Sequence, residues 1–161
     1  MVRKNKKEID YVKYVWGLVC SLSSIDQQRN NVSLFNIIDQ FNLPPAFFIE
    51  QKKQGKPLLF NFLFEIVLCW RRSLDVSFYN DEIQSDLKIK MVDPNGDVIQ
   101  EILAPLQCPK NMKIFRLRIT MNSGLATTPG MYAYQIEIKD HFKEDFKKVS
   151  EIPFEVVEKV V

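Results

Sequence analysis

Large apolar side chains occupy every second position of one long segment of the chain. They are Leu58, Phe60, Phe62, Phe64, Ile66, Leu68 and Trp70. Only an extended chain places residues i, i+2 and i+4 on one face, because an α-helix spreads them around its circumference. The intervening positions are mixed, so one face belongs to a dry core and the other is partly covered. The segment Leu58–Arg72 therefore predicts a β-sheet protein, with a bend or bulge near the start of this long strand or near Cys69.

Further strand signals lie on both sides of this segment. Before it, strands are predicted at residues 14–22 and 32–41, and the second is apolar on both faces, which is typical of a central, buried strand. After it, residues 87–91 and 98–103 form a hairpin whose Asp-Pro-Asn-Gly turn suits a type I turn. Three more strands are predicted, at residues 115–121, 130–138 and 152–161.

One short helix interrupts the strands. Pro45 stands near its start, Lys52 and Lys53 lie in its last turn, and Gly55 follows as a stop signal. A chain of 161 residues is long enough for one domain with its own core. We therefore predict an all-β fold over residues 11–161. It is a single antiparallel β-sandwich of about seven to eight strands with one short helix near residues 45–54, preceded by a flexible basic segment at residues 1–10.

Three segments resemble known sandwich proteins. Residues 130–140, GMYAYQIEIKD, resemble a Pro-Gly-x-Tyr-x-x-x-Ile strand of many bacterial immunoglobulin-like sandwiches, and residues 87–99, LKIKMVDPNGDVI, resemble their inner hairpin. Residues 18–44, LVCSLSSIDQQRNNVSLFNIIDQFNLP, are similar to the opening of a small, uncharacterised family of bacterial β-sandwich proteins. The resemblance implies an immunoglobulin-like sandwich over most of residues 14–157, and it implies no activity, cofactor or catalytic residue.

Composition restricts the compartment and the partners. The net charge of +2 is too small for a nucleic-acid footprint over the whole domain, so nucleic acid is not the expected partner. The three cysteines form no Cys-x-x-Cys pair, and an odd number fits a reducing compartment. No apolar stretch reaches the roughly 18 residues of a membrane span. The sequence therefore predicts a soluble, cytoplasmic protein with no membrane span and no cofactor.

No combination of residues predicts catalysis. His141 is the only histidine, and it stands in a charged turn with no nucleophile pattern beside it. Cys108 has Lys110 nearby, which would lower the pKa of its thiol, although an inert thiol is the favoured interpretation. Cys20 and Cys69 fall in predicted strands and are interpreted as small core hydrophobes. We predict that the protein is not an enzyme.

Oxygen-bearing side chains alternate in the hairpin turn, at Asp93, Asn95 and Asp97. Calcium loops alternate in this way, but the glycine that an EF-hand loop needs comes too early here. Ordinary turn chemistry explains the pattern, and a calcium cluster of Asp93 and Asp97 with Asp81 or Glu82 is the alternative. We predict no metal site.

Two groups of residues are candidates for binding. The arginine group combines four arginines with two aromatic side chains able to stack on bases: Arg71, Arg72, Arg116, Arg118, Phe78 and Tyr79. The apolar group combines the second face of the long strand with the last predicted strand: Leu59, Leu63, Val67, Val156 and Val160. The second face needs a cover, namely the helix, the N-terminal segment or a partner chain. The last strand is the predicted sheet edge, open to another chain.

These observations predict a non-catalytic β-sandwich that serves as a binding or assembly module, with a protein partner or a second copy of the chain bound through the apolar group. The alternative is an anionic-ligand or single-stranded nucleic-acid binding domain that uses the arginine group.

Overall fold

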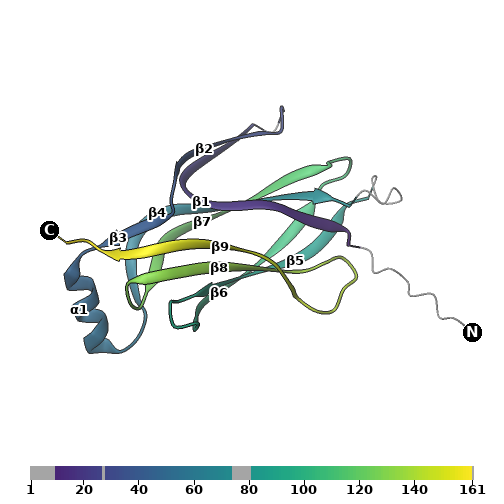
Figure 1. The fold of residues 1–161 in the computed structure, drawn as a ribbon. Coiled ribbons are helices and arrows are strands. Elements are labelled where there is room, and N and C mark those ends of the chain that lie inside the picture. The colour runs from purple at the N-terminus through teal and green to yellow at the C-terminus, as the bar shows by residue number, and fades with distance from the viewer. Residues whose placement is uncertain (1–9, 27, 74–80, 161) are drawn as a thin grey trace, which may run out of the picture.

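The computed structural model describes residues 10–26, 28–73 and 81–160, which form two β-sheets and one helix (Figure 1). The elements in chain order are β1 (Val12–Asp26), β2 (Asn31–Ile37), β3 (Gln40–Leu43), α1 (Pro45–Gln54), β4 (Leu58–Arg72), β5 (Ile83–Val92), β6 (Val98–Cys108), β7 (Ile114–Ala126), β8 (Gly130–Lys139) and β9 (Lys147–Glu158). One sheet has the strand order β2-β1-β4-β7, and the other has the order β3-β9-β8-β5-β6. The predicted all-β fold with one short helix is confirmed, and the predicted strand count is corrected to nine in the described residues.

One hydrophobic core joins the two sheets. From the four-stranded sheet, β4 contributes its predicted inner face, where Phe64, Ile66, Leu68 and Trp70 are all 0% exposed. From the five-stranded sheet, the rings of Tyr134 and Phe154 stack with their centroids 5.0 Å apart. Each large apolar side chain that is fully buried contributes about 1.5–3 kcal/mol relative to an exposed one. The alternation in the sequence therefore marks one strand of this core.

The long strand has the predicted bounds, Leu58–Arg72. It pairs with β7 along its length, and a register shift between Asn61 and Phe64 marks the predicted irregularity near its start. Its pairing with β1 is shorter and runs only between Glu65 and Arg72. The first half of β4 thus has one strand neighbour, whereas the second half has two.

The predicted strand at residues 32–41 is wrong as a single element. The structure divides it into β2 and β3, which belong to different sheets, and the chain crosses between them at Ile38 and Asp39. Nor is β2 central and buried, because it is a sheet edge whose Phe35 and Ile37 are 49% and 64% exposed. Two short strands that each have one apolar face give the same continuous apolar run as one buried strand.

The last strand is not a sheet edge. β9 lies between β8 and β3, and β3 pairs with it in parallel, so the sheet is not purely antiparallel as predicted. Val156 is consequently 0% exposed, while Val160 lies beyond the strand and is 88% exposed. The prediction that β9 is the open edge is wrong, because β3 crosses from the other sheet and covers it.

The helix joins β3 to β4 at one end of the molecule (Figure 1). It spans Pro45–Gln54 as predicted, and Phe48 is its buried residue. Gly55 follows with φ 65°, a left-handed conformation that glycine adopts without a Cβ penalty, and its N–H donates to the Gln51 carbonyl.

β1 and β2 form an arm that leaves the four-stranded sheet (Figure 1). We define the arm as residues 21–37, because β1 has no further partner residue in β4 beyond Cys20, which pairs with Glu65. Asn30, near the tip of the arm, donates through Nδ2 to the Ile114 carbonyl of β7 at 3.1 Å. The arm thus turns toward the outer face of its own sheet.

Candidate functional site

Arg72 of the arginine group is buried and holds backbone carbonyls. It is 3% exposed, and its guanidinium donates to the carbonyls of Met112 at 2.8 Å, Pro109 at 2.7 Å and Cys108 at 3.4 Å. A further hydrogen bond goes to the Asp81 carbonyl. These bonds tie the loop after β6 to the end of β4. Phe78 and Tyr79 of the arginine group lie outside the described residues.

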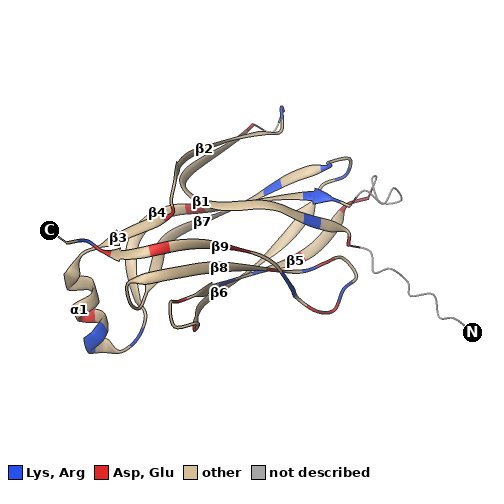
Figure 2. Cartoon of the chain, in the orientation of Figure 1, with Lys and Arg blue, Asp and Glu red and all other residues tan. Residues whose placement is uncertain are grey.

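The three other arginines lie on one face. Arg116 and Arg118 of β7 pair with Cys69 and Val67 of β4, and Arg71 follows two positions after Cys69, so all three share the outer face of the four-stranded sheet. Figure 2 shows basic positions at the same end of β1, β4 and β7. Lys13 of β1 is the direct partner of Arg71 and adds a fourth cation. We call Lys13, Arg71, Arg116 and Arg118 the basic face.

Two of these arginines also hold the arm. Nη1 of Arg116 donates to the backbone carbonyl and to Oδ1 of Asn30, each at 2.8 Å. Arg118 donates to the Ser23 carbonyl at 3.2 Å, and its Nε lies 4.0 Å from the carboxylate of Glu65. Glu65 is 6% exposed and accepts a hydrogen bond from the Ser23 hydroxyl. The acid compensates part of the positive charge on this face.

The cover of the second face of β4 is mainly the chain's own arm and arginines. Val67 is 0% exposed because Arg118 reaches across β4, from β7 to Ser23 on the arm. The cover does not extend to the first half of β4, where Leu59 and Leu63 are 66% and 60% exposed. Of the apolar group, these two residues and Val160 are exposed, and Val67 and Val156 are buried.

A cavity of about 550 Å³ opens beside the uncovered half of β4. It lies between β3, the start of α1 and the first residues of β4, and its apolar walls come from Ile38, Phe41, Leu43, Phe47, Phe60 and Phe62. This volume is typical of a small-ligand site or of a pocket for a large side chain. We call this cavity, with its walls, the aromatic seam.

Aromatic contacts fix the shape of the seam. The ring of Phe41 has its centroid 5.3 Å from that of Phe60 and 5.4 Å from that of Phe62. Phe60 lies across Gly124 of β7, where an added Cβ would come within 2.1 Å of the phenyl ring. Glycine is required there by close approach, and it allows Phe60 to form the floor of the cavity.

Two strand sides border the seam. β3 has β9 as its strand neighbour, and the first half of β4 has β7, so each has a second side that pairs with no other strand of the described residues. Gln40, Asn42 and Asn61 also line the cavity, and no charged side chain does so among the described residues. The site therefore combines an apolar floor with uncharged polar groups and backbone able to pair with an extended chain.

The seam was missing from the sequence-based prediction. The stripe of Phe60, Phe62 and Phe64 was assigned to the core, and the structure places Phe62 at 44% exposure. The register shift in β4 and the departure of β1 cause this difference. The available signals were the uncovered Leu59 and Leu63 positions and the proline break before the helix.

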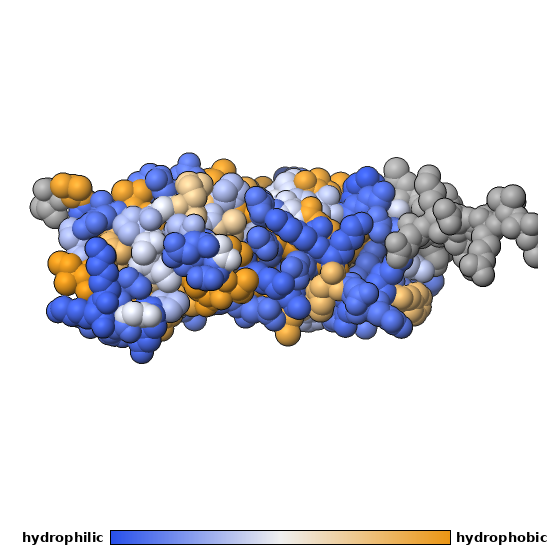
Figure 3. Space-filling model, turned by 60° about the horizontal axis from the view of Figure 1, so that its bottom comes forward, coloured by the Kyte–Doolittle hydropathy of each residue, from blue (hydrophilic) through white to orange (hydrophobic). Residues whose placement is uncertain are grey.

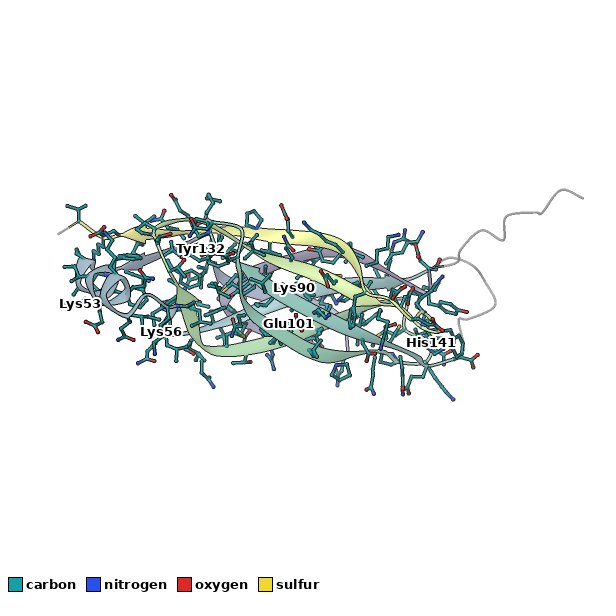
Figure 4. The ribbon with its side chains drawn as sticks, turned by 90° about the horizontal axis from the view of Figure 1, so that it is seen from below. Lys53, Lys56, Lys90, Glu101, Tyr132 and His141 are labelled. Carbon is teal, nitrogen blue, oxygen red and sulfur yellow. The ribbon has the colours of Figure 1, made fainter. Side chains whose placement is uncertain are left out.

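His141 lies far from the seam. Figure 4 shows it at the opposite end of the molecule from Lys53 of α1. Its Nδ1 is 2.8 Å from the Gln84 carbonyl, and its ring packs edge-on against Tyr11 with centroids 5.2 Å apart. These contacts hold the loop after β8 against β5 and against Tyr11, which precedes β1.

All three cysteines are buried free thiols. Burial raises the pKa of Cys20, Cys69 and Cys108, and in Cys108 the guanidinium of Arg72 opposes this rise. The idea that Lys110 lowers the Cys108 pKa is wrong, because β6 extends to Cys108 and carries its side chain inside. The thiols are held in their uncharged form.

The hairpin turn uses its oxygen atoms internally. The Asp93 carboxylate accepts hydrogen bonds from the N–H groups of Asn95 and Asp97, at 2.9 and 3.0 Å, and from the Thr127 hydroxyl at 2.8 Å. Burial acts to raise the pKa of Asp93, but these hydrogen bonds outweigh it and lower the pKa. In residues 10–26, 28–73 and 81–160, no three His, Cys, Asp or Glu side chains are grouped to hold a metal ion. Nor does that part of the chain contain a helix long and apolar enough to cross a membrane.

Comparison with known proteins adds no assignment. No protein-family model matches the sequence, and no curated protein matches it. The geometry of the seam and of the basic face therefore provides the basis for a functional proposal.

Proposed function

We propose that the protein is a non-catalytic β-sandwich of the immunoglobulin-like kind that binds an extended peptide segment of a partner protein at the aromatic seam. The observation that carries this proposal is an apolar cavity of about 550 Å³ bordered by two strand sides that pair with no other strand of the described residues. Peptide-binding domains that add a strand to a sheet use this combination, in which backbone pairing gives affinity and pockets select side chains.

The bound peptide lies extended along the first half of β4. Alternate side chains of an extended peptide point to opposite sides, so every second one faces the cavity between Phe41, Phe47 and Phe60. Burying one large apolar side chain there contributes about 1.5–3 kcal/mol. Because the lining residues carry no charge, the preferred peptide has uncharged apolar residues at alternate positions.

A peptide library tests this proposal. We expect selection on the purified protein to enrich peptides with apolar residues at positions i and i+2, measured afterwards by fluorescence anisotropy. Phe62→Glu places a charge on the wall of the seam and weakens binding at least about tenfold, since burial of an unpaired charge costs more than 1.4 kcal/mol. Leu103→Glu is the matched control, because Leu103 is an apolar residue on β6 with 65% exposure.

Backbone pairing is tested separately with the enriched peptide. Methylation of alternate backbone nitrogens removes donors that pair with the strand and leaves the side chains in place. We expect one methylated set to lose binding and the complementary set to retain it. Equal affinities of the Phe62→Glu and Leu103→Glu proteins, or no enriched peptide, would contradict the proposal.

The second candidate function is binding of an anionic ligand at the basic face. It is favoured by the four cations there and by Trp16, which is paired with Cys69 and so shares this face. Lys13→Ala with Arg71→Ala is the informative variant, because Arg116 and Arg118 also hold the arm. We expect binding to heparin or to an oligothymidine at low salt to fall in this variant. No binding by the wild-type protein at low salt would exclude this candidate.

A further inference from the structure

The four sheet edges differ in their protection against pairing with other chains. Sheet edges are normally kept from such pairing by charge, proline or short length. β7 carries Arg116 and Arg118, β6 carries Glu101 and Pro105, and β3 has four residues. β2 has seven residues, Asn-Val-Ser-Leu-Phe-Asn-Ile, with no charge and no proline. Of these edges, β2 alone lacks these protections.

The side chains next to this edge are also apolar and exposed. Phe35 and Ile37 of β2 are 49% and 64% exposed, and Leu22, the pairing partner of Phe35 on β1, is 55% exposed. Leu22 and Phe35 share one face of the arm because they are paired, and Ile37 follows beyond Asn36, paired with Cys20 two positions before Leu22. An uncharged edge beside an apolar face is a template for strand pairing.

We propose that β2 pairs antiparallel with β2 of a second copy of this chain, and that a twofold axis joins two four-stranded sheets into one continuous sheet. A second copy fits this edge because a twofold contact brings the same strand against itself, and an uncharged strand meets no like charge in doing so. Phe35 and Ile37 meet their copies at the junction, and Leu22 of β1 packs beside Phe35 on the same face.

The position of the arm allows this contact. The arm projects from the body of the molecule, so its free edge is presented away from the five-stranded sheet (Figure 1). β2 hydrogen-bonds along its length to β1 and to no other strand of the described residues. The proposal does not rest on the proposed function, because the β2 edge pairs through its own backbone, although it adjoins the aromatic seam where Ile37 is followed by Ile38.

Sedimentation velocity of the full chain over a wide concentration range tests the proposal. We expect a concentration-dependent dimer in the wild type. Phe35→Lys puts like charges on both copies at the junction and raises the dimer dissociation constant at least about tenfold. Leu103→Lys on β6 is the matched control and leaves the dimer unchanged, because Leu103 is exposed but lies at a protected edge.

Circular dichroism verifies the fold of each variant. If Phe35→Lys perturbs folding, Ser33→Lys, also on β2, replaces it and is expected to weaken the dimer in the same way. Phe62→Glu leaves the dimer intact, so loss of peptide binding and loss of dimerisation are separable. A wild-type monomer at all concentrations would overturn the proposal. So would a dimer that responds equally to the lysine variants of β2 and β6.

Discussion

The two sheets differ in how their outer faces are completed. In the five-stranded sheet, β5 alternates buried residues with more exposed ones, and ion pairs such as Lys90–Glu137 at 2.8 Å and Lys139–Asp86 at 2.7 Å lie outside. In the four-stranded sheet, residues 64–70 of β4 are all buried on both faces, and exposed apolar residues lie beside them. The outer face of β5 thus alternates toward water, although Leu103 of the neighbouring β6 is exposed, whereas the second half of β4 is buried on both faces.

Figures 3 and 4 show the underside of the molecule, where the five-stranded sheet lies. Figure 3, turned so that the underside comes forward, shows mostly hydrophilic surface with separate hydrophobic patches. Figure 4 places Lys90 and Glu101 side by side near the middle of the five-stranded sheet. The seam, the basic face and the arm all involve the four-stranded sheet. The basic face and the arm belong to the four-stranded sheet, whereas the seam lies between β4 of that sheet and β3 at the edge of the five-stranded sheet.

The largest expected difference is between the losses of protein stability caused by replacing two phenylalanines. Phe154 of the five-stranded sheet is 1% exposed and its ring stacks on those of Tyr132 and Tyr134, so Phe154→Ala lowers the free energy of unfolding by about 3–5 kcal/mol. Phe62→Ala in the seam lowers it by about 1 kcal/mol or less, because Phe62 is 44% exposed. Urea unfolding measures both, and equal losses would remove the distinction between the core and the seam.

The adjacent residues Arg71 and Arg72 allow a surface arginine to be compared with a buried one. Arg72→Ala lowers the free energy of unfolding by about 2–4 kcal/mol, because buried carbonyls lose a charged donor. Arg71→Ala changes it by about 0.5 kcal/mol or less, since Arg71 lies on the outer face. Thermal or urea unfolding of the two variants under the same conditions checks this order. A larger loss of stability in Arg71→Ala than in Arg72→Ala would mean that the basic face contributes to stability.

The Gly124→Ala variant is expected to change both the stability of the protein and peptide binding at the seam. The added Cβ displaces the ring of Phe60 and lowers the free energy of unfolding by about 1–3 kcal/mol. The displaced ring also enters the cavity, so peptide binding falls in the folded variant. Ser123→Ala is the neighbouring control and changes both quantities little. Unchanged binding by folded Gly124→Ala would show that Phe60 does not form the floor of the ligand site.

The smallest effect is a pH dependence at the hairpin turn. Because the folded-state pKa of Asp93 is lowered, its carboxylate stabilises the protein above the unfolded pKa of about 3.9, and this stabilisation is lost as pH falls through the folded pKa. The difference in unfolding free energy between wild type and Asp93→Asn is therefore constant near neutral pH and shrinks below about pH 4. A difference that grows on acidification would contradict the internal role of this turn.

Patterns among residues close together in the chain correctly predicted one long strand and the helix. The alternation of Leu58–Arg72 and the end signals of Pro45–Gln54 identified β4 and α1 with their observed bounds. Both signals depend on residues close together in the chain, through side-chain direction and capping.

Features that depend on distant pairing were not predictable. Whether β9 is an edge is decided by β3, which crosses from the other sheet. The seam brings Phe41 and Phe47 against Phe60 and Phe62, and no pattern within either segment encodes the space between them. The arginines were predicted on strand faces, yet only the register of β1 with β4 shows that Lys13 joins them and that Arg72 points elsewhere.

Amide chemical-shift mapping locates the peptide on the protein, with the isotopically labelled full chain titrated with a peptide that has apolar residues at alternate positions. If the peptide binds at the seam, the largest shifts fall in β3, at the start of α1 and in the first half of β4. Shifts confined to Lys13 and Arg71 on the basic face, or to the arm, would contradict binding at the seam.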